Sequence, residues 1–88
     1  MFLYRVKVEE LDAARLLTLK RDLARREPSL REHCPIREMS LVSDAGRDLD
    51  IYLALDDIIE ADQLARLVGE LNAALDDVRH VSSELIHI

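Results

Sequence analysis

The side chains that could bind a metal ion are few and scattered. Three histidines and one cysteine are present: His33 next to Cys34, and His80 and His87 near the end of the chain. Zinc sites pair their ligands at short spacings, such as two residues between cysteines. No such pair occurs here, and His80 and His87 would point to opposite faces of an expected strand. We therefore predict no metal site and no cofactor.

A single lysine is the candidate for a reactive amine. Lys20 falls within the apolar stripe of an expected helix, between Leu17 and Leu23. A lysine buried there would lose its proton more easily and could act as a base or an amine nucleophile. The alternative, which we favour, is a lysine whose stem packs on the protein while its ammonium group reaches solvent.

Several functional classes lack the motifs that they need. Asp44, Asp48 and Asp50 surround Gly46, but their spacing does not match a calcium-binding EF-hand loop, and a polar turn explains them. The chain has no glycine-rich phosphate loop. Two tyrosines and one phenylalanine make a poor platform for stacking bases, and a net charge of −6 argues against nucleic acid. We assign no catalytic residue.

Length and composition indicate one domain spanning residues 1–88. The chain is 49% hydrophobic and 34% charged, which is typical of a globular protein. One cysteine cannot form an internal disulfide, and no apolar run approaches the roughly 18 residues of a membrane span. The first residues lack the layout of a signal peptide. We expect a cytoplasmic location.

The hydrophobic periodicity predicts six elements. Alternating residues indicate strands, and apolar stripes at helical spacing indicate helices. Asp12 is the expected N-cap of the first helix, and Pro28 is expected to end it. Residues 28–35 form a connection with at most one helical turn, and Asp57 and Glu60 resemble a capping box for the second helix. The elements are strand 2–8, helix 13–26, strand 36–43, strand 49–55, a helix ending near residue 76, and strand 79–88.

The order β-α-β-β-α-β predicts an α+β fold of the ferredoxin-like type. Each helix has one apolar stripe and must cover a face of the sheet. The simplest arrangement is a four-stranded antiparallel sheet in the order 4-1-3-2, with both helices on one face. Sixteen leucines favour a filled core.

Two surfaces are candidates for self-association into a homo-oligomer. The second helix has a stripe of small residues that could pack on the first helix or on a helix of another subunit. The uncovered sheet face should present Tyr52 and Ala54 beside Arg5 or Lys7, which can meet Asp50 across the strands. The stripe comprises Ala61, Ala65, Gly69 and Ala73.

Three segments resemble ACT-like domains, and more narrowly the cytoplasmic C-terminal domain of MgtC/SapB-family membrane proteins. They are Leu3–Val8, Leu49–Leu55 and Leu67–Val81. The resemblance implies a regulatory domain and a parent membrane protein as partner. Classical ACT domains have a glycine where the first strand meets the first helix, whereas this chain has Glu9–Asp12 there. No ligand contact is therefore transferred.

Our first functional hypothesis is a non-enzymatic regulatory or protein-interaction domain that self-associates. The alternative is a small free-standing dimeric enzyme of the ferredoxin-like monooxygenase or isomerase type. That enzyme would need a pocket between the helices and the sheet, with His80, His87 or Lys20 facing it. A third hypothesis, a metal-sensing domain, would require metal binding that depends on His80 or His87.

Overall fold

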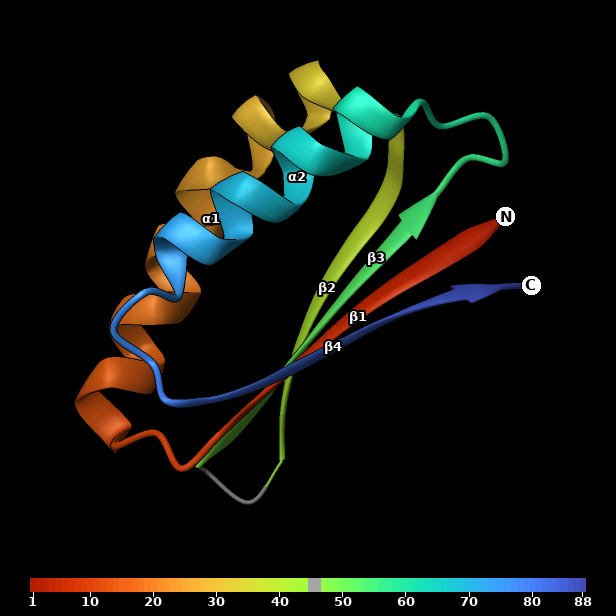
Figure 1. The fold of residues 1–88 in the computed structure, drawn as a ribbon. Helices are drawn as coiled ribbons and strands as arrows, with labels where there is room; N and C mark the ends of the chain where they lie inside the picture. The colour runs from red at the N-terminus through yellow and green to blue at the C-terminus, as the bar shows by residue number, and fades with distance from the viewer. Residues whose placement is uncertain (45–46) are drawn as a thin grey trace.

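The computed structural model describes residues 1–44 and 47–88, which form six elements in the predicted order (Figure 1). The centre of the predicted turn, at Gly46, lies outside the described residues. No helix in the described part of the chain is both long and apolar enough to span a bilayer. The elements are β1 (Phe2–Glu9), α1 (Ala13–His33), β2 (Ile36–Asp44), β3 (Asp48–Leu55), α2 (Ala61–Ala74) and β4 (His80–His87).

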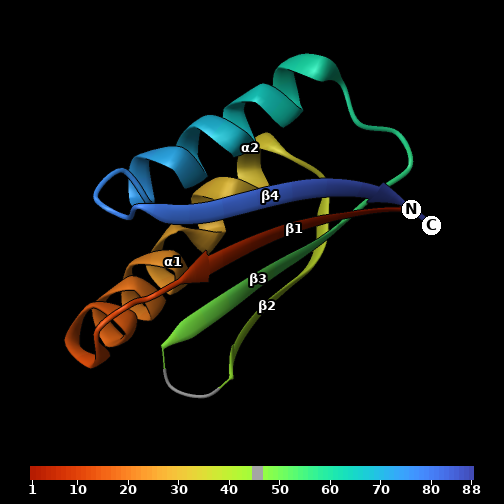
Figure 2. The same cartoon turned by 60° about the horizontal axis from the view of Figure 1, so that its bottom comes forward.

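The four strands form one antiparallel sheet in the order β2-β3-β1-β4. This is the predicted order 4-1-3-2 counted from the other edge, so the predicted topology is confirmed. Strand β1 is central and pairs with both β3 and β4, while β2 and β4 are the edges. Figure 2 shows both helices on the same side of the sheet, which leaves the opposite face uncovered.

Helix α1 extends beyond its predicted end and passes through Pro28. Proline lacks the N–H that would bond to the carbonyl of Ala24. Both residues are exposed, so that carbonyl lies at the solvent side of the helix. Two residues after Pro28, Leu30 is buried, and its carbonyl accepts a hydrogen bond from the Cys34 N–H at 3.1 Å. The predicted connection over 28–35 is wrong because burial of this leucine outweighs the lost hydrogen bond.

Helix α2 begins at a different capping box from the predicted one. Glu60 and Gln63 form this box, and the Gln63 side-chain oxygen accepts the N–H of Glu60 at 3.0 Å. Asp57, the predicted cap, lies outside the helix, and Ile58 next to it is exposed. The helix starts later because Gln63 supplies the reciprocal bond that its first turn needs.

A leucine-rich core fills the space between the sheet and the two helices. Strand β3 contributes every second residue, and in the described part of the chain no polar or charged side chain is buried. The filled core that the leucine content predicts is confirmed. Its most completely buried large side chains are Leu19, Leu23, Leu30, Leu49, Ile51, Leu53, Leu55, Leu67, Leu71 and Val8.

Candidate functional site

A pocket of about 420 Å³ lies at one end of the layers, where the β1–α1 connection meets the α2–β4 connection. We call it the end pocket. Its volume falls within the roughly 300–1,000 Å³ that small organic ligands occupy in proteins. It lies beside the core and not between the helices and the sheet, where the enzyme hypothesis required a pocket and where leucines fill the space instead. Its lining comprises Glu9, Glu10, Leu11, Asp12, Arg15, Asp77, Val78, Arg79 and His80.

His80 and Glu10 lie within hydrogen-bonding distance of each other in the end pocket. The Nε2 atom of His80 lies 2.8 Å from a carboxylate oxygen of Glu10. A carboxylate in this position orients the imidazole and fixes which ring nitrogen carries the proton, so the other nitrogen can accept one. The pair therefore has the composition of a general base with its positioning carboxylate.

The backbone of Glu10 adopts a strained conformation. Its φ angle is 59°, in the left-handed region that non-glycine residues rarely enter. Such a conformation costs about 1–3 kcal/mol and persists where the surrounding structure holds it. Here the next residue, Leu11, is buried in the core, and its N–H donates to the Arg47 carbonyl at 2.9 Å. These two anchors fix the direction in which the Glu10 side chain points away from the backbone.

Arg15 and Asp77 join the two connections that form the end pocket. The guanidinium donates through Nε and Nη2 to the two carboxylate oxygens of Asp77, at 2.8 and 2.7 Å. Nη2 also donates to the carbonyl of Ala74 at 3.2 Å. The hydrogen bond from Arg15 lowers the pKa of the Asp77 carboxyl, and the same bond raises the pKa of Arg15. Asp12 accepts the Arg15 N–H at 2.7 Å, which confirms the predicted N-cap.

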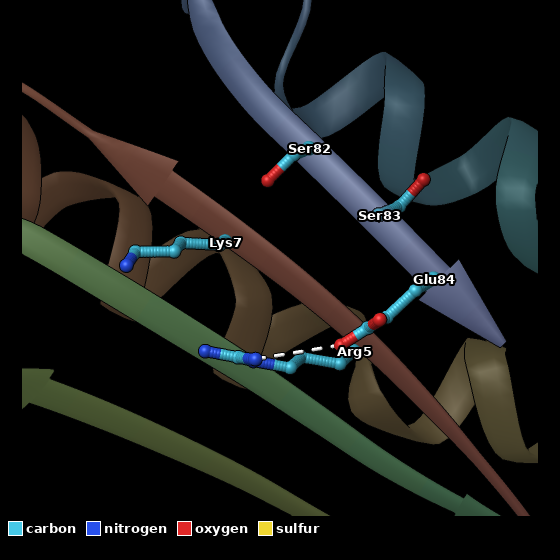
Figure 3. Close-up of a pocket in the computed structure, with 5 residues that line it drawn as sticks. All are labelled: Arg5, Lys7, Ser82, Ser83 and Glu84. Carbon is cyan, nitrogen blue, oxygen red and sulfur yellow. Dashed lines mark hydrogen bonds and ion pairs between the residues drawn. The ribbon is translucent and has the colours of Figure 1, made fainter. Parts of the chain in front are cut away.

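The uncovered sheet face has a separate polar cluster at its centre (Figure 3). Arg5 on β1 donates to Glu84 on β4 at 3.4 Å, and its guanidinium lies 3.9 Å from Asp50 on β3. It also lies 5.8 Å from the centre of the Tyr52 ring. Tyr52 first, then Glu84 and Asp50, raise the pKa of Arg5. The prediction that Arg5 or Lys7 meets Asp50 is confirmed for Arg5.

The pocket beside this polar cluster does not suit an organic substrate. Its volume is about 200 Å³, below the usual range for small organic ligands. Figure 3 shows Ser82 directed toward β1 and Ser83 directed the other way, so the two serines belong to opposite faces of β4. The charges of Arg5 and Glu84 pair within the chain, and their contact ties β4 to β1.

The other reactive side chains named from the sequence lie outside the end pocket. Lys20 is half-buried on α1, and a role for it remains a prediction. The ring of His87 stacks on Phe2 with centroids 4.7 Å apart. His33 is the last residue of α1. Cys34 is buried, and this burial raises the pKa of its thiol. Within residues 1–44 and 47–88, no three potential metal ligands gather in one place.

The stripe of small residues lies on the exposed side of α2, and the described part of the chain does not cover it. A Cβ atom added at Gly69 would meet no atom within 4 Å, so α1 does not pack against this position. Contact of the stripe with a second subunit remains a prediction. Tyr52 and Ala54 do lie on the uncovered sheet face, where they line a shallow pocket of about 390 Å³ together with Leu3 and Val42.

Sequence reasoning missed most of the end pocket. His80 was named from its residue type, but Glu10, Arg15 and Asp77 belong to no recognisable motif. Arg15 and Asp77 are 62 residues apart and meet only after both helices have packed. The sole local signal was the expected N-cap at Asp12, which marks the start of α1 and hence one wall of the pocket.

No protein-family model matches the chain. No curated protein matches it either. Solved structures do match, and they show the fold. A protein from Nitrosomonas europaea described as an antibiotic biosynthesis monooxygenase superposes with a TM-score of 0.73 at 7% identity, covering 99% of this chain and 88% of that one. A protein of the same description from Deinococcus radiodurans gives 0.72 at 11% identity, with coverages of 100% and 92%.

A third solved structure is the cofactor-independent oxygenase SnoaB from Streptomyces nogalater. It superposes with a TM-score of 0.67 at 13% identity, covering 99% of this chain and 90% of that one. These neighbours contradict the hypothesis of an ACT-like regulatory domain, and nothing supports the resemblance to MgtC/SapB proteins or a parent membrane protein. They agree with the alternative, a small ferredoxin-like protein of the monooxygenase type.

Proposed function

We propose that this chain is a small oxygenase that oxidises an organic substrate with molecular oxygen and without a metal or flavin. The observation that carries the proposal is that the likeness to SnoaB and to the two monooxygenase-like proteins spans nearly the whole of both partners. This chain therefore shares the fold of such proteins over most of their length. The end pocket supplies the space and the titratable groups that the chemistry needs.

The electron balance restricts the substrate class. When O₂ places one oxygen atom in a product and releases the other as water, it takes up four electrons. Without an external reductant, the substrate must supply all four. A methylene group activated by a neighbouring carbonyl or aromatic ring does so, since R₂CH₂ + O₂ gives R₂C=O + H₂O. The proposed substrate is an organic molecule with such a methylene.

His80 and Glu10 have complementary roles in this chemistry. The reaction begins when a base removes a proton from the methylene, because the resulting carbanion is electron-rich enough to reduce oxygen. His80 is the proposed base, and Glu10 is a positioning residue that holds its ring. General bases of this kind contribute about 10²–10⁴-fold to rates. Neighbouring Arg79, which also lines the pocket, supplies positive charge for the substrate anion.

Oxygen uptake tests the proposal. The probe is anthrone, whose methylene is flanked by two aromatic rings, and its product is the corresponding quinone. We expect the protein to accelerate oxygen uptake above the buffer rate, with one quinone formed for each O₂ consumed. His80→Gln should reduce the accelerated rate by at least 100-fold, while His87→Gln, outside the end pocket, should not. A wild-type rate equal to that of buffer would contradict the proposal.

We also propose that the chain acts as a homo-oligomer. The apolar side chains that the sheet exposes support this proposal: Val42 is 48% exposed, Leu85 44% and Ile86 39%.

A further inference from the structure

Strand β4 exposes apolar side chains on both of its faces. Every residue of this strand is exposed, although β4 is hydrogen-bonded to β1 along its whole length. Val81 and Leu85 lie opposite the buried Val8 and Tyr4 and so belong to the helix side, where they are 39% and 44% exposed. On the other face, Ile86 is 39% exposed. An apolar edge strand in this state is a site for the addition of another strand.

We propose that β4 pairs with β4 of a second copy of this chain, antiparallel, about a two-fold axis at Ser83. The two four-stranded sheets would then form one continuous eight-stranded sheet. Such an interface is isologous: each copy offers the same strand, and each residue pair occurs twice.

The side-chain pattern of β4 selects this register. Centring the axis on Ser83 places Val81 opposite Leu85 of the second copy, so the exposed apolar residues on the helix side cover one another. Ser82 then lies opposite Glu84 of the second copy, where a hydroxyl can donate to a carboxylate. Each of these contacts occurs twice, and cross-strand pairs of this kind stabilise by about 0.2–1 kcal/mol each.

The two neighbouring registers are less favourable. An axis at Glu84 places two carboxylates directly opposite each other, and like charges in this position destabilise a strand pair. An axis at Ser82 leaves Leu85 and Ile86 beyond the paired region of the partner's strand. Of these three registers, only the one centred on Ser83 places Val81 opposite Leu85 and separates the carboxylates.

The same register places Ile86 of the second copy opposite His80, at the rim of the end pocket. If the proposed function holds, the second copy adds an apolar wall beside the proposed base. The pairing itself rests only on the exposed strand and its side-chain pattern, and it is tested without any measurement of activity.

Cysteine cross-linking tests the register, with adjacent serines as a matched pair. At an axis through residue 83, the two Cα atoms lie about 4.5–5.5 Å apart, within disulfide reach. The two copies of residue 82 would be offset along the strands and lie about 8 Å apart, beyond that reach. The native Cys34 is buried and its pKa is raised, so it does not compete. Under mild oxidation Ser83→Cys should give a covalent dimer at least ten-fold faster than Ser82→Cys.

Sedimentation tests the pairing itself. We expect the wild-type chain to shift from monomer to dimer as its concentration rises. Leu85→Glu should remain monomeric, because it places a carboxylate opposite Val81 of the second copy. The matched control is Leu17→Glu on α1, where the leucine is 53% exposed, and it should dimerise like the wild type. The proposal is overturned if the wild type stays monomeric, if Leu85→Glu still dimerises, or if Ser82→Cys cross-links as fast as Ser83→Cys.

Discussion

The two edge strands of the sheet, β2 and β4, are hydrogen-bonded alike but buried very differently. Strand β2 contributes the buried Ile36 to the core, and its Met39 and Leu41 pack against that core. No residue of β4 is buried. The comparison shows that a strand can complete the hydrogen bonds of a sheet without sharing in the hydrophobic burial that stabilises it.

The unequal lengths of the two helices are consistent with the different burial of β2 and β4. Helix α1 has 21 residues and α2 has 14, so α1 is about 10 Å longer at a rise of about 1.5 Å per residue. The last turn of α1 brings Leu30 into the core and leads directly into β2. Helix α2 buries Leu67 and Leu71 in the same core, yet β4 stays exposed on its helix side.

The largest expected effect separates a core strand from the exposed edge. Leu53→Ala in β3 should lower the free energy of unfolding by about 2–5 kcal/mol, because it opens a cavity in a packed core. Leu85→Ala in β4 should cost the monomer about 0.5 kcal/mol or less, as expected for a surface position. Urea denaturation at a protein concentration that keeps the chain monomeric measures both. Equal losses would show that β4 is packed as tightly as β3, contrary to the comparison.

An intermediate effect concerns α2, whose outer side is uncovered. Gly69→Ala should raise the free energy of unfolding by about 1 kcal/mol, because alanine is the better helix former and the added methyl group meets no atom. The reverse exchange, Ala65→Gly on the same side of the helix, should lower it by a similar amount. Thermal denaturation compares the two variants. Destabilisation by Gly69→Ala would mean that another helix lies close to this position.

The smallest effect concerns the acid stability of the connection that leads into β4. Since Arg15 lowers the pKa of Asp77 in the folded chain, the pair stabilises the fold above the ordinary carboxyl pKa of 3.8. That contribution is lost as the pH falls below 3.8 toward the lowered value. Asp77→Asn should therefore be less stable than the wild type at pH 7, and the difference should narrow at pH 3. Urea midpoints at both pH values measure it.

Asp76→Asn is the control for this pH dependence, because it leaves the pair of Arg15 and Asp77 intact. It should show a smaller change between pH 7 and pH 3 than Asp77→Asn does. If the urea midpoint of each variant differs from that of the wild type by the same amount at pH 7 and at pH 3, the carboxyl of Asp77 does not cause the acid dependence.

The fold could be predicted from the sequence because its signals are local. The alternation of Leu49, Ile51 and Leu53 defines a strand by itself, and the apolar stripe of α2 defines a helix. The rule that proline ends a helix failed at Pro28, since burial of Leu30 is a tertiary effect that no local pattern contains. The end pocket depends on such effects throughout: Glu10 and His80 become neighbours only after β4 has paired with β1.

The pairing of β1 with β4 also determines the order in which the sheet can be completed at least entropic cost. These strands are joined by the whole of the intervening chain, whereas β2 and β3 are neighbours in the sequence. The chain entropy lost on closing a loop rises with the length of the loop. Forming the β2–β3 hairpin therefore loses the least entropy of the strand pairs, and forming the β1–β4 pair loses the most. On a ribosome, β4 is also the last of the six elements to be synthesised. The central strand β1 must therefore keep one edge unpaired until the other five elements have been made.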